Sequence, residues 1–341
     1  MSDGIGPAGS GEHGDPNGTP SRRSALLGPA EVRELAERLG VSPTKKLGQN
    51  FVIDPNTVRK IVRLAGVREG DRVIEVGPGL GSLTLGITEA GAEVTAVEID
   101  HRLAAELPST ARAMQPDIFA DPARPRLHVV RSDALEVTLA DLLLRRPGRA
   151  AEMESIATSA SRDEARDSHG SVALPEVLVA NLPYNVSVPI LMHLLELLPS
   201  LRRGLVMVQS EVGTRIAASP GSKEYGAPSA KAAWYGEWRI AGTVSRRIFW
   251  PVPGVDSVLV SYERRGQPRG DEAERHGTFA LVNAAFAQRR KMLRQALQPV
   301  LGPLDRAIAV IEAAGLDPTS RAEQLGIDDY LALARSHARR S

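Results

Sequence analysis

The chain of 341 residues contains no cysteine, which excludes a disulfide framework and a thiolate metal site. No apolar run approaches the roughly 18 residues that a membrane-spanning helix needs. The first 20 residues are rich in Gly, Pro and Ser and have no apolar core, which excludes a signal peptide there. Acidic residues are missing from Gly277 to Pro303, although the formal net charge of the whole chain is only +1. We therefore expect a soluble, cytoplasmic, metal-free protein with no membrane partner and one locally basic region.

What is present predicts an α/β protein followed by a helical domain. We expect a disordered leader over residues 1–28 and a large domain over 29–265 that contains a disordered insertion at 145–173. A charged, Gly- and Pro-bearing linker at 266–277 then leads to a helical RNA-binding domain over 266–341. Alternating β-rich and helical stretches from Arg72 onward imply a parallel, doubly wound sheet. The expected strands are 72–76, 93–98, 127–131, 177–180 and 204–209, with a final pair at 238–243 and 257–263. The expected helices are 30–39, 55–65 with Asp54 as N-cap, 278–298, 303–314 and a last helix from 320 onward.

A glycine turn between the first of these strands and the next helix predicts a cofactor loop. Gly77, Gly79 and Gly81 stand at the first, third and fifth positions, and Glu75 precedes them. A dinucleotide fingerprint requires a sixth-position glycine, but Ser82 occupies that place. The spacing matches an S-adenosylmethionine loop better, whereas alone it is also compatible with a purely structural turn.

Acidic residues at the next two strand ends support this interpretation. Glu98 closes the second expected strand, where a carboxylate can accept both ribose hydroxyls, and Asp133 follows the third, where it can accept from an adenine amino group. Either residue alone is better explained as a helix N-cap or a solvated loop acid. Because the strand ends of an open α/β sheet share one crevice, the residues together predict a cofactor site.

The segment Asn181-Leu182-Pro183-Tyr184, directly after an apolar strand, predicts a pocket for a flat base. The Asn181 side chain and the Leu182 carbonyl can accept hydrogen bonds from an exocyclic amino group, Pro183 stiffens the turn, and Tyr184 can stack on a purine. The alternative is a rigid strand-to-helix turn. Positioning, rather than a general base, would drive transfer of a methyl group to adenine N6. The proline-bearing loop, residues 248–257, could hold Phe249 against the opposite face of the base. The alternative is a hydrophobic loop anchor, a role that suits Trp250 better than Phe249.

The acid-free region carries Arg289, Arg290, Lys291 and Arg294, which we expect to cluster on one helix and to contact RNA phosphates. Arg246 and Arg247, just before Phe249, could extend that surface. A charge run of this kind is more often simply a solvated face.

From residue 45 to 334, apart from 145–173, the chain resembles the small-subunit ribosomal RNA adenine dimethyltransferase family. The motifs that carry the resemblance are Leu47-Gly48-Gln49-Asn50-Phe51, the cofactor loop, Asn181 to Tyr184, Gln209-Ser210-Glu211-Val212, Tyr225-Gly226, Phe249 to Ser257, Phe286-Ala287-Gln288-Arg289-Arg290-Lys291 and Arg321-Ala322-Glu323-Gln324-Leu325. The resemblance implies a Rossmann-like class I S-adenosylmethionine-dependent methyltransferase sheet with a small C-terminal all-helical domain.

The resemblance also implies site residues and a substrate. Cofactor contacts fall on Asn50, Val52, Gly77, Glu98, Asp133 and Asn181, and the base is held by Asn181 to Tyr184 with Phe249. The implied substrate is two adjacent adenines in the 3′-terminal hairpin loop of 16S ribosomal RNA, dimethylated at N6 on a nearly assembled small subunit by a monomeric enzyme. Departures are the long leader, the insertion, and Val52 in place of the commoner Leu.

Two other functions stay open from the sequence. One is a related enzyme that methylates an adenine of large-subunit RNA and confers macrolide resistance; the C-terminal helices and Tyr184 argue against it. The other is a non-catalytic RNA-binding assembly factor, against which the intact Asn181, Glu98 and Asp133 argue.

Overall fold

A computed structural model describes residues 26–41, 50–122, 125–143 and 174–340. Most of the predicted leader and the predicted insertion lie outside these described residues. The leader prediction reached too far, however, because Leu26 and Leu27 are only 2% and 4% exposed and pack into the core. Within the described residues, none of the helices combines the length and apolar character needed to cross a membrane.

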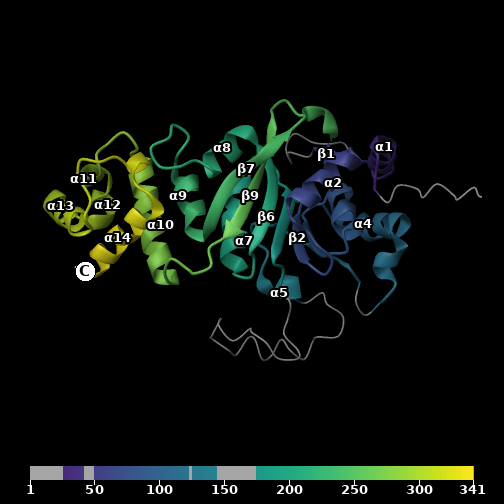
Figure 1. The fold of residues 1–341 in the computed structure, drawn as a ribbon, viewed down its shortest axis with the longest axis horizontal. Coiled ribbons are helices and arrows are strands. Elements are labelled where there is room, and N and C mark those ends of the chain that lie inside the picture. The colour runs from purple at the N-terminus through teal and green to yellow at the C-terminus, as the bar shows by residue number, and fades with distance from the viewer. Residues whose placement is uncertain (1–25, 42–49, 123–124, 144–173, 341) are drawn as a thin grey trace, which may run out of the picture.

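A mixed seven-stranded sheet forms the centre of the molecule (Figure 1). Its strands lie in the order β4-β3-β2-β5-β6-β9-β7, and the neighbours from β4 to β6 are parallel. β9 is antiparallel to both β6 and β7, so the sheet is not wholly parallel as the repeated crossovers predicted. The strands are β2 (Arg72–Val76), β3 (Glu93–Glu98), β4 (Leu127–Arg131), β5 (Val177–Asn181), β6 (Arg203–Gln209), β7 (Gly236–Val244) and β9 (Ser257–Arg264).

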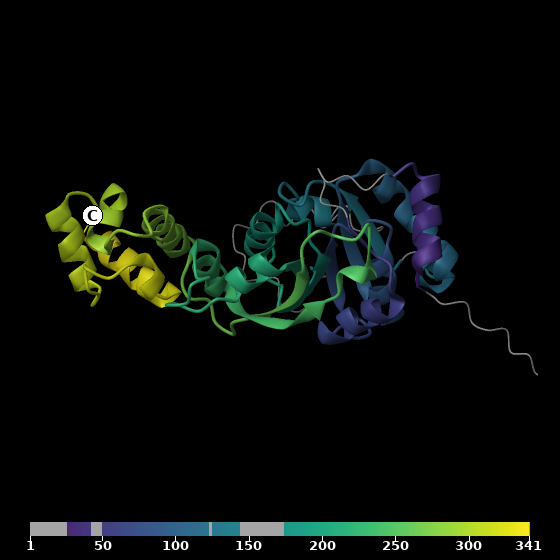
Figure 2. The ribbon, with the colours of Figure 1, turned by 90° about the horizontal axis from the view of Figure 1, so that it is seen from above.

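Some helices cover the sheet, and others form a separate group at one end of the molecule. α10 to α14 gather beyond α9, and α1 lies at the opposite end (Figures 1 and 2). The α-helices are α1 (Pro29–Arg38), α2 (Pro55–Leu64), α3 (Ser82–Glu89), α4 (His101–Met114), α5 (Leu139–Leu143), α7 (Ser187–Leu197), α8 (Ser210–Ile216), α9 (Ala227–Tyr235), α10 (Glu272–Ala287), α11 (Leu293–Ala296), α12 (Gln298–Leu301), α13 (Leu304–Ala313) and α14 (Ile327–Ala338). Short 3₁₀ turns are η2 (Pro116–Phe119), η4 (Arg246–Ile248) and η5 (Ala322–Gln324).

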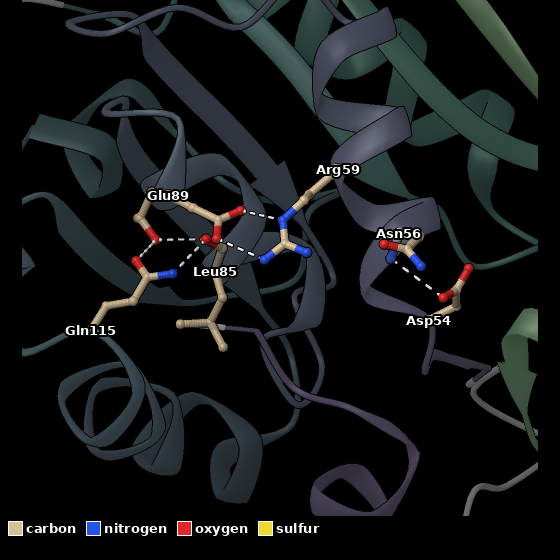
Figure 3. A network of polar contacts seen from close by, with 7 residues as sticks. Asp54, Asn56, Arg59, Leu85, Glu89 and Gln115 are labelled. Carbon is tan, nitrogen blue, oxygen red and sulfur yellow. Dashed lines mark hydrogen bonds and ion pairs between the residues drawn. The ribbon is translucent and has the colours of Figure 1, made fainter. Parts of the chain in front are cut away.

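Local signals place the helices that frame the glycine turn. Asp54 accepts hydrogen bonds from the N–H groups of Asn56 and Thr57, which confirms it as the N-cap of α2. Figure 3 shows how α3 is then held on both sides. Arg59 of α2 makes two hydrogen bonds to Glu89, and Gln115 donates to the Leu85 carbonyl at 2.8 Å. The helix that begins at the glycine turn is therefore fixed before any ligand binds.

A two-stranded ribbon that the sequence did not predict lies beside the main sheet. β1 (Phe51–Val52) pairs antiparallel with β8 (Phe249–Trp250), and the rings of Phe51 and Trp250 stack with centroids 6.3 Å apart. The ribbon joins a segment near the N-terminus to the proline-bearing loop about 200 residues later in the chain.

The C-terminal helices share an apolar core with the sheet domain. One continuous cluster of buried side chains includes Ile74 of β2, Leu191 of α7, Trp234 of α9 and Tyr330 of α14. The hydroxyl of Tyr225, just before α9, donates to the Leu325 carbonyl at 2.9 Å. The boundary predicted at residue 266 is therefore not a gap between two separate cores.

Two predictions for the C-terminal region were wrong. The linker expected at 266–277 is helical from Glu272, because Asp271 caps α10 and accepts from the Glu274 N–H at 2.8 Å. The helix expected over 278–298 ends at Ala287. After it, the Leu293 N–H donates to the Ser320 carbonyl, so this stretch pairs with the chain ahead of α14 instead of continuing the helix.

Candidate active site

A cavity opens where the parallel strands end, beside the switch point between β2 and β5. Its wall includes Gly77 after β2, Glu98 at the end of β3, Asp133 after β4 and Asn181 at the end of β5, with Asn50 across from them. The structure thus brings together the predicted cofactor residues Asn50, Val52, Gly77, Gly79, Glu98, Asp133 and Asn181 in one crevice. This is the edge at which open α/β sheets bind their ligands.

The glycine turn after β2 has a backbone conformation that residues with a side chain rarely adopt. Gly77 and Gly79 have φ angles of +66° and +58°. A Cβ atom on Gly79 would come within 2.9 Å of the Phe51 ring, so the turn also needs a bare backbone for packing. The loop is therefore built into the wall of the cavity.

Glu98 links the glycine turn to the end of β3. The side chain is only 4% exposed, and burial raises the pKa of its carboxyl group. One carboxylate oxygen accepts from the Gly79 N–H at 3.1 Å and the other from the Asp100 N–H at 2.9 Å. Asp100, not Glu98, is the N-cap of α4, so the helix-cap alternative for Glu98 does not hold. Glu98 faces the cavity and can still accept ligand hydroxyls with its remaining lone pairs.

Asp133 lies half-buried on the cavity wall, and one carboxylate oxygen accepts from the Leu135 N–H at 2.9 Å. Two apolar side chains that the sequence did not predict also line the cavity, those of Ile99 and Leu135, which are 55% and 37% exposed. The sequence did contain a signal for these two residues, because an apolar residue follows closely after each acidic residue at a strand end. An acceptor in the same wall as exposed apolar side chains suits a flat ring with an amino group.

Buried polar groups lie deeper in the same wall. Glu75 is 1% exposed, Thr84 Oγ1 donates to it at 2.6 Å, and burial raises the pKa of its carboxyl group to about 8. The Ser82 hydroxyl, at the start of α3, is buried in the wall and has no hydrogen-bond partner among the described residues. A polar ligand at this end of the cavity would supply that partner, so the residues fit the amino-acid end of S-adenosylmethionine.

Asn181 is fixed in one orientation by a contact with another residue of the cavity wall. Its Nδ2 atom donates to the main-chain oxygen of Asn50 at 2.9 Å. The side-chain oxygen is then the atom left to accept from a ligand. The Leu182 N–H donates to the Met207 carbonyl at 3.1 Å, which holds the turn after β5 against β6. Asn181, Leu182 and Pro183 all line the cavity.

The two predicted stacking aromatics differ in position. Tyr184 is half-buried beyond the cofactor cavity, and its hydroxyl lies 2.8 Å from Ser257 Oγ. Phe249 of β8, by contrast, is 1% exposed and packs in the apolar core. Phe249 does not line the cavity in this structure, so its contact with the base stays a prediction. Trp250 packs partly buried against the same core, as expected of a hydrophobic loop anchor. Pairing with Val52 turns Phe249 inward and leaves Trp250 the more exposed residue.

The predicted RNA-contacting cations separate into paired and unpaired groups. Arg246 donates to Asp256 Oδ1 at 2.6 Å and to the Gly254 carbonyl at 3.1 Å, so it clamps the proline-bearing loop. Arg289 donates to Glu323 at 2.6 Å. Arg247, Arg290 and Lys291 are exposed and have no ion pair within the described residues. Because α10 ends at Ala287, Arg289, Arg290 and Lys291 lie in the turn after it and Arg294 on α11, not on one helix.

Comparison with known proteins places this geometry in one family. The family model described as ribosomal RNA adenine dimethylase matches residues 41–339. The ribosomal RNA small subunit methyltransferase A of Leifsonia xyli subsp. xyli is 60% identical over 309 residues, which cover 91% of this chain and 98% of the relative. The protein of the same name from Streptomyces griseus subsp. griseus is 51% identical, with 91% and 94% covered.

Solved structures agree on the fold. A dimethyladenosine transferase from Plasmodium falciparum is 20% identical with a TM-score of 0.62, covering 83% of this chain and 95% of its own. The 23S rRNA methyltransferase ErmE is 22% identical with a TM-score of 0.54, covering 85% and 100%. The extent of the family match and the curated relatives together show that this chain belongs to the ribosomal RNA adenine dimethylase family, whose members are S-adenosylmethionine-dependent methyltransferases.

Proposed function

We propose that this protein transfers methyl groups from S-adenosylmethionine to N6 of two adjacent adenines in the 3′-terminal hairpin loop of small-subunit ribosomal RNA. The observation that carries the proposal is the Asn181–Asn50 hydrogen bond of 2.9 Å, which leaves the Asn181 oxygen as an acceptor at the cavity. That acceptor matches the N–H group of an adenine amino group rather than a keto oxygen.

The residues of the cavity have different roles, according to where they lie. Asp133 with its apolar neighbours suits the adenine ring of the cofactor, and Glu98 suits the ribose. When bound, the cofactor supplies an electrophilic methyl group on a positive sulfonium. Asn181 and the Leu182 carbonyl orient the target amino group so that its lone pair faces that methyl group. Because a methylated ammonium loses its proton readily, these residues need to position the nitrogen rather than to remove a proton first.

Relatives favour the small subunit over the alternative on the large subunit. Eight curated relatives at 47% to 60% identity have small-subunit names, whereas the 23S enzyme shares the fold at 22% identity. The ordered cavity with Asn181 in place argues against a purely non-catalytic assembly factor. Action on the assembling subunit, a monomeric state, a cytoplasmic location and a distinct RNA-binding domain over 266–341 stay predictions that belong to this proposal.

The experiment that tests the proposal supplies purified small subunits lacking the modification, together with methyl-labelled S-adenosylmethionine. Label mapped by nucleotide is expected at two adjacent adenines near the 3′ end. Large subunits serve as the control substrate, and label appearing there instead would support the alternative enzyme. Protein that labels neither subunit would refute a catalytic role.

A further inference from the structure

Ser257 is the first residue of β9, the strand that lies between β6 and β7. It pairs with Gln209 of β6 on one side and with Val244 of β7 on the other, and it is 1% exposed. The Ser210 N–H also donates to the carbonyl of neighbouring Asp256 at 2.9 Å. Because β9 runs antiparallel to β6, its start lies at the same edge as the ends of β5 and β6, where the base pocket is expected.

The Ser257 hydroxyl meets the far end of the Tyr184 side chain. The two oxygens lie 2.8 Å apart, although the residues are 73 positions apart in the chain. The main chain of the turn is itself held, since the Leu182 N–H donates to Met207 and the Val186 N–H to the Pro183 carbonyl at 3.3 Å. The aromatic ring is therefore fixed both at its Cα end and at its hydroxyl.

We propose that Ser257 is a positioning residue for methyl transfer: its hydroxyl holds the Tyr184 ring in the orientation that stacks on the target adenine. The inference rests on the proposed function and extends it to a residue outside the base pocket. Stacking requires face-to-face overlap of two rings, and a tyrosine side chain free to rotate about its two torsions loses that overlap for part of the time. A ring anchored at both ends presents its face to the incoming base without further ordering.

The competing explanation is that Ser257 merely satisfies the hydroxyl of a half-buried tyrosine. The Tyr184 side chain is half-buried; this burial raises the pKa of its hydroxyl, and the Ser257 hydrogen bond acts in the opposite direction. A purely structural contact would change thermal stability alone. If the contact positions the ring, its loss would lower both the rate of methyl transfer and the stacking of the base. Both effects would depend on the Tyr184 hydroxyl.

The test compares Ser257→Ala, Tyr184→Phe and the double variant, with Ser257→Thr as the conservative form that keeps a hydroxyl. Ser261→Ala is the matched control, since Ser261 lies on the same strand and donates to the Arg239 carbonyl on an exposed part of it. Three quantities are measured for each: kcat/KM for transfer to unmodified small subunits, calorimetric affinity for S-adenosylmethionine, and fluorescence of 2-aminopurine placed at the target adenine in a hairpin RNA.

We expect Ser257→Ala and Tyr184→Phe each to lower kcat/KM about 3- to 10-fold, the range that loss of one hydrogen bond produces. The double variant should lose no more than either single one, because both remove the same contact. Quenching of 2-aminopurine should weaken in parallel, cofactor affinity should stay at the wild-type level, and Ser257→Thr should restore transfer. Ser261→Ala should behave like the wild type throughout.

Several results would overturn the inference. Losses that multiply in the double variant would show that Ser257 acts independently of Tyr184, and unchanged quenching in Ser257→Ala would show that it does not position the ring. Wild-type transfer to small subunits, measured first, keeps the two proposals apart. Active wild-type protein with an unaffected Ser257→Ala variant defeats only the positioning role, whereas wild-type protein inactive on every adenine defeats both.

Discussion

The ring of Phe51 lies directly against the main chain of Gly79, so that a Cβ atom on Gly79 would stand 2.9 Å from Phe51 Cε1. Phe51 belongs to the ribbon that pairs with the proline-bearing loop, and Gly79 donates to Glu98. A single van der Waals contact therefore connects the cofactor turn to the segment next to the expected base pocket.

Gly79→Ala should lower the affinity for S-adenosylmethionine and destabilise the protein. The added methyl group meets the Phe51 ring and also forces alanine to adopt a φ of +58°. Gly40→Ala is the matched control, because Gly40 has a φ of +59° but, among the described residues, no neighbour within 4 Å of the added Cβ. The control should show only the backbone strain of about 1–2 kcal/mol, without loss of cofactor affinity. Calorimetric titration and thermal melts check both; equal cofactor affinity in the two variants would contradict the contact.

Asn181→Ala should reduce methyl transfer by about 100-fold or more, the scale seen when one positioned hydrogen-bonding group is removed from an active site. Affinity for S-adenosylmethionine should change little, because Glu98, Asp133 and the glycine turn keep their places. Transfer to unmodified small subunits and calorimetric binding are the two measurements. Asn56→Ala, an exposed asparagine at the start of α2, is the control. Full transfer by Asn181→Ala would refute the base-pocket assignment.

Glu75 should make stability depend on pH in the direction opposite to that of an ordinary carboxylate. Burial raises the pKa of this group from 4.5 to about 8 in the folded protein, so the folded state keeps a proton that the unfolded state releases between these values. The stabilisation is fully present below pH 4.5 and is lost as pH rises toward 8, by at most about 1.4 kcal/mol per pH unit.

Glu75→Gln has nearly the shape of the protonated, uncharged glutamate. It should therefore remove the decline of stability with rising pH. Chemical denaturation at pH 5 and pH 8 measures the free energy of unfolding for the wild type, Glu75→Gln and the exposed control Glu34→Gln. A decline as steep in Glu75→Gln as in the wild type would assign the effect to another group, such as Glu98, whose pKa is also raised by burial.

Salt dependence of RNA binding should separate the unpaired cations from the paired ones. Arg290→Ala and Lys291→Ala should each reduce the slope of log affinity against log salt by about 0.7–0.9, since each removes one exposed charge. Arg289→Ala should instead lower the melting temperature, because it breaks the ion pair with Glu323 that ties the turn to η5. Filter binding of RNA across salt concentrations and thermal melts check the difference. An unchanged slope in Arg290→Ala and Lys291→Ala would mean that this turn does not contact phosphate.

The local parts of the fold could be predicted from the sequence, whereas the parts made by distant pairing could not. The parallel strands and the N-cap Asp54 were predicted closely, because apolar runs and capping residues act over a few positions. The β1–β8 ribbon could not be predicted, because two-residue strands are too short to show an alternating pattern of apolar and polar residues. The end of α10 at Ala287 could not be predicted either, because Gln288, Arg289 and Arg290 all favour helix. The pairing of Met292 and Leu293 with residues 320–321 is a contact between distant parts of the chain.

The candidate site shows the same division. Strand-end acids and glycines could be located because topology carries them to one edge of the sheet. Phe249 could not be placed, because its burial depends on pairing with Val52. The ion pair between Arg246 and Asp256 could not be predicted either. The sequence shows the positive charge of Arg246, but not that Asp256, ten residues later, neutralises it.

The interior shared by the sheet and the last helices limits how the chain can be dissected. Phe279 of α10 packs edge-on against Trp234 and Tyr235 of α9, with ring centroids 5.9 and 6.2 Å apart. A fragment stopping at residue 265 would bare those indole and phenol faces to water and invite self-association. We therefore expect the sheet domain and the C-terminal helices to unfold in a single transition, because each covers apolar side chains of the other.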